Sequence, residues 1–110
     1  MRDFYVLEGR TPKRVTYAEW VIFFERGNRT VALDMVGKVK VSTVFLGIDH
    51  NFRGEGPPLL FETMVFGGPL NETQERCSTW AEAEAQHAHI LGRVHHAQAL
   101  MRGAEEKVKS

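Results

Sequence analysis

Six polar side chains with the chemistry for acid–base catalysis or ligand binding lie in one largely apolar stretch, residues 39–68. They are Ser42, Thr43, Asp49, His50, Glu62 and Thr63. Burying a polar group costs free energy unless the group finds a partner. The pattern therefore predicts either a structural hydrogen-bond network or a ligand-binding site.

The neighbours Asp49 and His50 are candidates for acid–base catalysis. The carboxylate could orient the imidazole, and Glu62 could supply a second carboxylate, as in a small hydrolase. The nearest hydroxyl nucleophiles, Ser42 and Thr43, lie inside a predicted strand and not at an exposed turn. We therefore favour a structural interpretation, in which Asp49 caps a loop through an Asx-type hydrogen bond and His50 holds the loop in place.

The five histidines lack the spacing of a metal site. On a helix, His87 and His89 point to nearly opposite sides, and His89 and His96 lie two turns, roughly 10 Å, apart. A composite site would have to combine Asp49, His50, Glu62 and His87. We predict instead that His87 is hydrogen-bonded between a sheet and a helix, and we predict no metal and no cofactor.

Composition and charge exclude several classes of protein. Fourteen basic and fourteen acidic side chains give no net charge, which disfavours nucleic acid as a partner because phosphate binding needs a basic excess. No apolar run approaches the roughly 20 residues of a membrane span. Cys77 is the single cysteine, so no internal disulfide can form, and we expect a reducing, cytoplasmic location.

Apolar alternation and β-branched residues predict strands over residues 4–7, 30–35, 38–46 and 59–66. A tight turn is predicted at Val36-Gly37 and a loop over 47–58. In the last strand one face carries Leu59, Phe61, Thr63 and Val65. The strands should form one antiparallel sheet with an apolar face that needs a cover.

Two capping boxes predict helices, a short one after Thr16 and a long one after Thr79. The short helix should end at Gly27-Asn28 in a left-handed conformation, and the tail 103–110 should fray. We therefore predict an α+β fold with two layers, in which a small antiparallel sheet of three to five strands packs against both helices. A single domain spans 1–110, and exposed strand edges predict a homo-oligomer.

The long helix has two stripes at helical spacing. The apolar stripe consists of Ala83, His87, Ile90, Leu91, Val94, Ala97 and Met101, and the polar stripe of Glu82, Gln86, His89, Arg93 and His96. Arg93, flanked by two histidines, could hold a phosphate, and Phe52 or Trp80 could stack on a base. This is the composition of a binding pocket, although polar helix stripes are more often solvated faces.

The strings VSTVFLGIDHNF and GPPLLFETMVFGG, followed by RCSTWAEAEAQHAHI, resemble a family of small bacteriophage and prophage proteins. The resemblance covers Val39 to His87, and no catalytic activity comes with the family. The positions that match its pattern are Ser42, Thr43, Asp49, His50, Phe61, Glu62, Thr63, Met64 and His87. Cys77 departs from the aromatic residue that the pattern has before Ser-Thr.

The predicted layout, a small antiparallel sheet followed by a long C-terminal helix, is also similar to that of the phage Thoeris anti-defence sponges. Those proteins are oligomers that sequester cyclic ADP-ribose-type signals between protomers. The likeness implies that Arg93 and Arg102 meet phosphates and that an aromatic ring stacks on adenine.

We therefore expect a non-enzymatic phage or prophage accessory protein that sequesters a small anionic ligand, such as a cyclic nucleotide or an ADP-ribose-type immune signal. The predicted ligand-binding residues are Ser42, Thr43, Asp49, His50, Phe61, Glu62, Thr63, His87 and Arg93. One alternative is a protein–protein inhibitor of a host enzyme, and another is a small hydrolase that uses Asp49, His50 and Glu62. A structural protein whose polar cluster fixes the fold is a further alternative.

Overall fold

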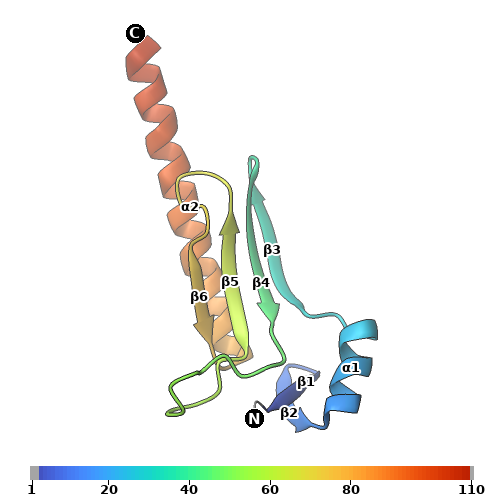
Figure 1. Cartoon of the computed structure of the whole chain (residues 1–110). Helices are drawn as coiled ribbons and strands as arrows, with labels where there is room; N and C mark the ends of the chain where they lie inside the picture. The colour runs from blue at the N-terminus through green and yellow to red at the C-terminus, as the bar shows by residue number, and fades with distance from the viewer. Residues whose placement is uncertain (1–2, 110) are drawn as a thin grey trace.

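A computed structural model describes residues 3–109 and has an α+β fold with two antiparallel sheets (Figure 1). The first sheet is a hairpin of β1 (Phe4–Glu8) and β2 (Thr11–Val15). The second has the order β3-β4-β5-β6, with bounds Thr30–Val36, Val39–Phe45, Phe61–Phe66 and Gln74–Cys77. The helices are α1 (Tyr17–Arg26) and α2 (Trp80–Lys109). The predicted fold class is confirmed.

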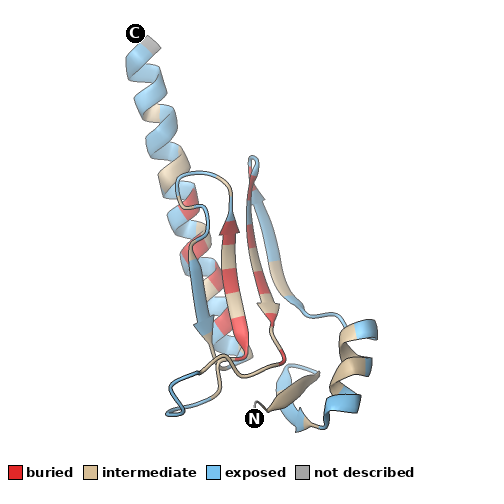
Figure 2. Ribbon diagram, viewed as in Figure 1, coloured by how far each residue is buried: buried red, intermediate tan, exposed pale blue. Residues whose placement is uncertain are grey.

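The core lies between α2 and one face of the four-stranded sheet (Figure 2). Antiparallel pairing aligns Val41 with Val65, Thr43 with Thr63 and Phe45 with Phe61, and alternate residues of β4 and β5 are buried. Two apolar clusters result. One contains Val36, Val39, Val41, Val65, Ile90 and Val94, and the other Phe45, Leu60, Phe61 and Ala83. The predicted grouping of Phe61, Thr63 and Val65 on one face of β5 is confirmed, and this is the buried face.

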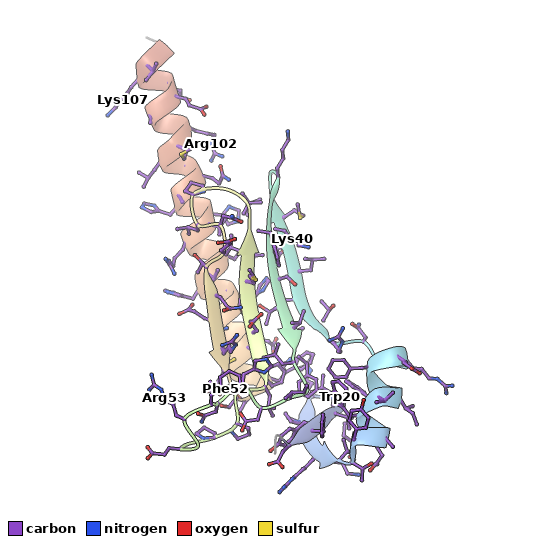
Figure 3. The ribbon with its side chains drawn as sticks, in the orientation of Figure 1. Trp20, Lys40, Phe52, Arg53, Arg102 and Lys107 are labelled. Carbon is purple, nitrogen blue, oxygen red and sulfur yellow. The ribbon has the colours of Figure 1, made fainter. Side chains whose placement is uncertain are left out.

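The short helix α1 packs mainly against β1, which pairs in a sheet of its own, and it meets the four-stranded sheet through Phe23, whose ring packs edge-on against Phe45 of β4. The predicted single sheet with two covering helices is therefore wrong in this detail. Its aromatic residues have a partner of their own, because Trp20 contacts both Phe4 of β1 and Phe24 one turn further along the helix. Figure 3 shows Trp20 between the helix and the hairpin. The capping box of Thr16 and Glu19 is present as predicted.

The end of α1 differs from the expected left-handed turn. Gly27 is extended, with φ −82° and ψ 152°, while its N–H still donates to the carbonyl of Phe23. The Asn28 side chain then accepts a hydrogen bond from the N–H of Thr30 at 2.9 Å. This Asx-type contact lets the chain leave the helix directly into β3 without a left-handed residue.

Two strands escaped the sequence prediction, and two boundaries moved. β2 (TPKRV) and β6 (QERC) are mostly polar and exposed edge strands, so apolar alternation could not reveal them. The hairpin turn falls at Gly37-Lys38, one residue later than expected, with Gly37 at φ +59°. β5 begins at Phe61 and not at Leu59, because the N–H of Leu59 donates to a side chain of the preceding loop.

Helix α2 continues to Lys109, so the predicted fraying of the tail is wrong for residues 103–109; Ser110 lies outside the described residues. Alanine, glutamate and lysine in this segment are strong helix formers, and Gly103 alone does not stop the helix. The C-terminal part of α2 projects beyond the sheet (Figure 1). No helix within residues 3–109 is long and apolar enough to cross a membrane.

Candidate functional site

The buried polar residues of the sheet form one hydrogen-bonded chain with α2. The hydroxyl of Thr43 lies 2.6 Å from that of Thr63 and 2.7 Å from Nδ1 of His87. Nε2 of His87 lies 2.8 Å from a carboxylate oxygen of Asp34 on β3. Both threonines are fully buried and His87 is 5% exposed, so water does not compete for the contacts among these three, whereas the Asp34 side chain is half exposed. His87 is the hydrogen-bonded residue between sheet and helix that the sequence predicts.

The two ends of the chain fix the direction of its hydrogen bonds. A carboxylate only accepts, so Nε2–H of His87 donates to Asp34. The amide nitrogen of Gln86 only donates, and it lies 3.0 Å from the Thr63 hydroxyl and 2.7 Å from a backbone carbonyl. With a neutral imidazole, Thr63 then donates to Thr43 and Thr43 donates to Nδ1 of His87. Each buried hydroxyl in this arrangement donates once and accepts once.

The order carboxylate, imidazole, hydroxyl is that of a hydrolase triad, but here it is inaccessible. A nucleophilic hydroxyl must reach a substrate carbonyl, whereas Thr43 is covered by α2 and has no exposed surface. Ser42 lies on the opposite face of β4, beside Leu33 and Met64 in the register. The geometry of Asp34, His87 and Thr43 therefore serves the fold.

Asp49 and His50 stabilise the loop between β4 and β5, as the structural interpretation predicts. One carboxylate oxygen of Asp49 accepts the N–H groups of Asn51 at 2.7 Å and Leu59 at 2.9 Å. Nδ1–H of His50 donates to the carbonyl of Ile48 at 2.7 Å. Asp49 thus holds both ends of the loop together. Its hydrogen bond from the N–H of Leu59 is the one that delays the start of β5.

Glu62 is engaged on the other face of the sheet, where α2 does not lie. Its carboxylate lies 2.9 Å from the guanidinium of Arg76 and 3.0 Å from the amide of Gln74, both on β6. Asp49 and His50 form their hydrogen bonds within the loop, whereas Glu62 bonds to β6, so the three side chains do not converge as a hydrolase site would need. No three histidine, cysteine, aspartate or glutamate side chains of residues 3–109 gather as a metal site.

Arg93 lies in an open groove of about 560 Å³ along the exposed side of α2. The groove is lined by Leu70, Ala88, His89, Gly92, Arg93, His96, Ala97 and Leu100. Leu70 comes from the segment between β5 and β6 and forms the far wall. The lining combines one guanidinium and two imidazoles with apolar side chains and includes no carboxylate.

The two aromatic residues proposed to stack on a base lie elsewhere. Phe52 lines a separate hollow of about 420 Å³ with His50 and Arg53, in the loop at the opposite end of the sheet from the projecting helix (Figure 3). Trp80 packs edge-on against Phe61, and Arg10 lies over its ring at 5.5 Å. The groove around Arg93 therefore has aliphatic walls.

The predicted site residues thus separate into five environments. Thr43, Thr63 and His87 form the buried chain, Asp49 and His50 the loop, Ser42 and Glu62 the open sheet face, Phe61 the core and Arg93 the groove. Asp34 was missed, and its only signal is its place in β3, where the register puts it beside Val41 on the face that α2 covers.

The single cysteine is not an activated nucleophile. Burial against the second apolar cluster and the nearby negative charge of Glu82 raise the pKa of the Cys77 thiol from 9.0 to about 11. A thiol with that pKa is protonated at neutral pH, and the thiolate is the reactive form. Arg76, although adjacent in sequence, directs its guanidinium to Glu62.

Comparison of the chain with known protein families, curated proteins and solved structures finds no match. The class of the protein therefore rests on its own architecture. It is an α+β protein with a four-stranded antiparallel sheet under one long helix and a separate unit of hairpin and short helix. Among the described residues, the groove around Arg93 combines one guanidinium and two imidazoles without a carboxylate, whereas the loop hollow has Glu55 beside Arg53 and His50.

Proposed function

We propose that this protein is a non-catalytic binding protein that holds a small anionic ligand in the groove around Arg93. The observation that carries the proposal is the lining of this groove, in which Arg93, His89 and His96 meet apolar walls without any carboxylate. A guanidinium binds phosphate or carboxylate oxygens in a fork, and imidazole N–H groups can add further donors. The volume lies in the range of small-molecule sites.

The fate of the other polar residues supports binding over catalysis. The imidazole and hydroxyls of the buried chain have partners and no access to solvent, and Asp49 is occupied by backbone N–H groups. An anion in the groove would meet donors but no nucleophile and no general base with a partner to orient it. The ligand should therefore leave unchanged.

The ligand class we propose is a phosphorylated small molecule, with a cyclic nucleotide or an ADP-ribose-type signal as the first candidate. The aliphatic walls formed by Leu70 and Leu100 fit an apolar or ring-shaped portion beside the anion. The proposed role is sequestration of an immune signal by a phage or prophage accessory protein. The resemblance to phage proteins suggests the source, and the likeness in layout to the sponges suggests the sequestration. Inorganic phosphate is the minimal probe of the same chemistry.

The test is calorimetric titration of the protein with inorganic phosphate, ADP-ribose and cyclic adenine nucleotides, followed by mass spectrometry of the recovered ligand. We expect at least one nucleotide to bind and to be recovered intact. The variant Arg93→Ala should weaken its affinity about 10- to 100-fold, because a charge-assisted hydrogen bond contributes about 1.5–3 kcal/mol. The matched control is Arg53→Ala, which removes the guanidinium of the other hollow.

Three results would contradict the proposal. Folded wild-type protein that binds no probe lacks the predicted site. Loss of affinity in Arg53→Ala but not in Arg93→Ala moves the site to the loop. Conversion of the probe by the wild-type protein replaces sequestration with an enzymatic function.

A second candidate function, inhibition of another protein, is favoured by the open face of the four-stranded sheet. Leu33, Met35 and Phe66 are exposed there, beside the half-buried Val44 and Met64. Large apolar side chains gathered on a sheet face can dock a partner. This candidate predicts that Met35→Glu abolishes inhibition of the target enzyme while leaving nucleotide binding unchanged, and the opposite pattern favours the groove.

A further inference from the structure

The stripe of α2 that faces the sheet keeps a strict seven-residue repeat beyond the end of the core. Its members are Ala83, His87, Ile90, Val94, Ala97, Met101, Ala104 and Val108, with steps that alternate between four and three residues. The first four are buried against the sheet, whereas Met101 is 48% and Val108 87% exposed. An alternation of four and three is the spacing of a coiled-coil seam, which packs against another helix. Half of the seam is therefore filled by this chain, and half is open.

The open half has the shape that receives a side chain from another helix. Met101, Ala104, Glu105 and Val108 line an almost wholly apolar hollow of about 300 Å³ on the surface of α2. Their spacing is i, i+3, i+4 and i+7, which is the four-residue hole of knobs-into-holes packing. Ala104 forms the floor, and the larger Met101 and Val108 form the two ends. Figure 2 shows this end of the helix almost entirely exposed.

The part of α2 that projects beyond the sheet would be only marginally stable in water by itself, because helical segments shorter than about 12–15 residues gain too little from their own hydrogen bonds. We propose that two copies of the chain associate through this half-seam, defined by Ala97, Met101, Ala104 and Val108, as an antiparallel helix pair. The interface is isologous, so each copy supplies both the knobs and the holes. The proposal does not depend on the ligand, although Ala97 also lines the groove around Arg93.

The antiparallel direction follows from where the sheet lies. On the seam side of α2, the buried core ends at Val94, and the turns that follow β3 and β5 reach on to Gln98 and Arg102. A parallel second copy would bring its own sheet to the same level and side, so the two sheets would collide. An antiparallel copy sends its sheet past the free end of α2, where Figure 1 shows no other element of the chain.

The side chains of the half-seam are complementary in size in that direction. Met101 lies opposite Ala104 of the second copy, and Ala97 opposite Val108, so each layer pairs a large with a small side chain. Antiparallel pairing also sets Gln98 beside Glu105 and Leu100 beside Lys107 across the two copies. Each charge next to the seam therefore meets an uncharged neighbour.

The first test is sedimentation velocity of the full chain from low micromolar to several hundred micromolar concentration. We expect a monomer–dimer equilibrium in the wild type and at least a tenfold weaker association in Met101→Asp, because burying an unpaired carboxylate is costly. The matched control is Ala99→Asp, which adds the same charge on the exposed opposite side of the helix and should leave association unchanged. Circular dichroism at low concentration shows whether each variant is folded.

A wild type that stays monomeric at every concentration overturns the proposal. A Met101→Asp variant that associates as the wild type does also overturns it, since dimerisation would then use another surface such as the open sheet face.

The direction of the helix pair is tested with a spin label at Ala85→Cys in a Cys77→Ala background. In the antiparallel pair the two labels are offset by about 35 helical residues, which corresponds to a distance of about 50 Å along the helix axis. In a parallel pair the two labels would lie within about 25 Å of each other. A distance near the shorter value overturns the antiparallel arrangement.

Discussion

The hydroxyl groups of Thr43 and Thr63 differ in what each would leave behind if removed, although they lie side by side and are equally buried. Thr43 receives the hydrogen of Thr63 and gives its own to His87. Removing Thr43 therefore strands one donor and one acceptor away from water. Removing Thr63 frees one N–H of the Gln86 amide, whose other N–H still donates to a backbone carbonyl, and it strands only a lone pair of Thr43.

We therefore predict that Thr43→Val lowers the free energy of unfolding by about 2–3 kcal/mol and Thr63→Val by about 1 kcal/mol. Both changes keep the shape of the side chain, so packing is matched between the two variants. The measurement is urea unfolding at neutral pH, followed by circular dichroism. An equal or larger loss in Thr63→Val would mean that the chain of hydrogen bonds runs in the opposite direction.

Asp34 shows the limit of sequence reasoning at this scale. The apolar setting of Thr43, Thr63 and His87 predicts that they need polar partners, and the structure supplies them to one another. Asp34 lies 53 residues before His87, and only the pairing of β3 with β4 brings it beside the helix. Pairing across that distance is a property of the whole sheet and leaves no local pattern in the sequence.

At the scale of elements, Gly47 joins the unit of hairpin and α1 to the rest of the molecule. Its carbonyl accepts the N–H of Tyr5 at 2.8 Å, and its φ is +74°. A Cβ atom at this position would collide with the ring of Phe24 and lie 2.7 Å from Nε1 of Trp20. The backbone of Gly47 is thus packed directly under the aromatic face of α1.

Gly47→Ala should consequently destabilise the contact between α1 and the sheet far more than Gly54→Ala affects the loop. Gly54 has nearly the same conformation, φ +75°, but nothing lies within 4 Å of its added Cβ atom. Its substitution costs only the left-handed strain, about 1–2 kcal/mol. We expect Gly47→Ala to cost at least 1 kcal/mol more and to change the fluorescence of Trp20, measured against a Trp80→Phe background. Equal stability of the two variants would contradict this role of Gly47.

The elements that could be predicted are those whose pattern is local. The capping boxes of both helices and the alternation of β4 and β5 are encoded by residues a few positions apart, and the structure contains them. β2 and β6 are polar edge strands held by pairing with a neighbour, and the partner of α1 is decided by which aromatic rings fit together. The groove around Arg93 depends on Leu70 approaching α2, and only the composition of its helical wall was visible beforehand.

The whole molecule is elongated, with extents of 61, 31 and 20 Å, because α2 extends beyond the core that it covers. The ligand groove and the half-seam follow each other along the same helix and share Ala97. The groove residues end at Leu100, while the open hollow of the half-seam begins at Met101. Neither apolar cluster contains any residue beyond Val94 among those described, so the projecting end contributes little to the folding of one copy.

This arrangement makes the two proposals separable in one variant that lacks residues 103–110. We expect it to stay folded, with a free energy of unfolding within about 1 kcal/mol of that of dilute wild type. Its melting temperature should no longer rise with protein concentration, because only association couples stability to concentration. Nucleotide affinity should be unchanged, since the groove is complete within residues 70–100. Thermal melts at a range of protein concentrations and one nucleotide titration check all three expectations. If the truncated variant loses both dimerisation and nucleotide binding, the second copy completes the ligand site.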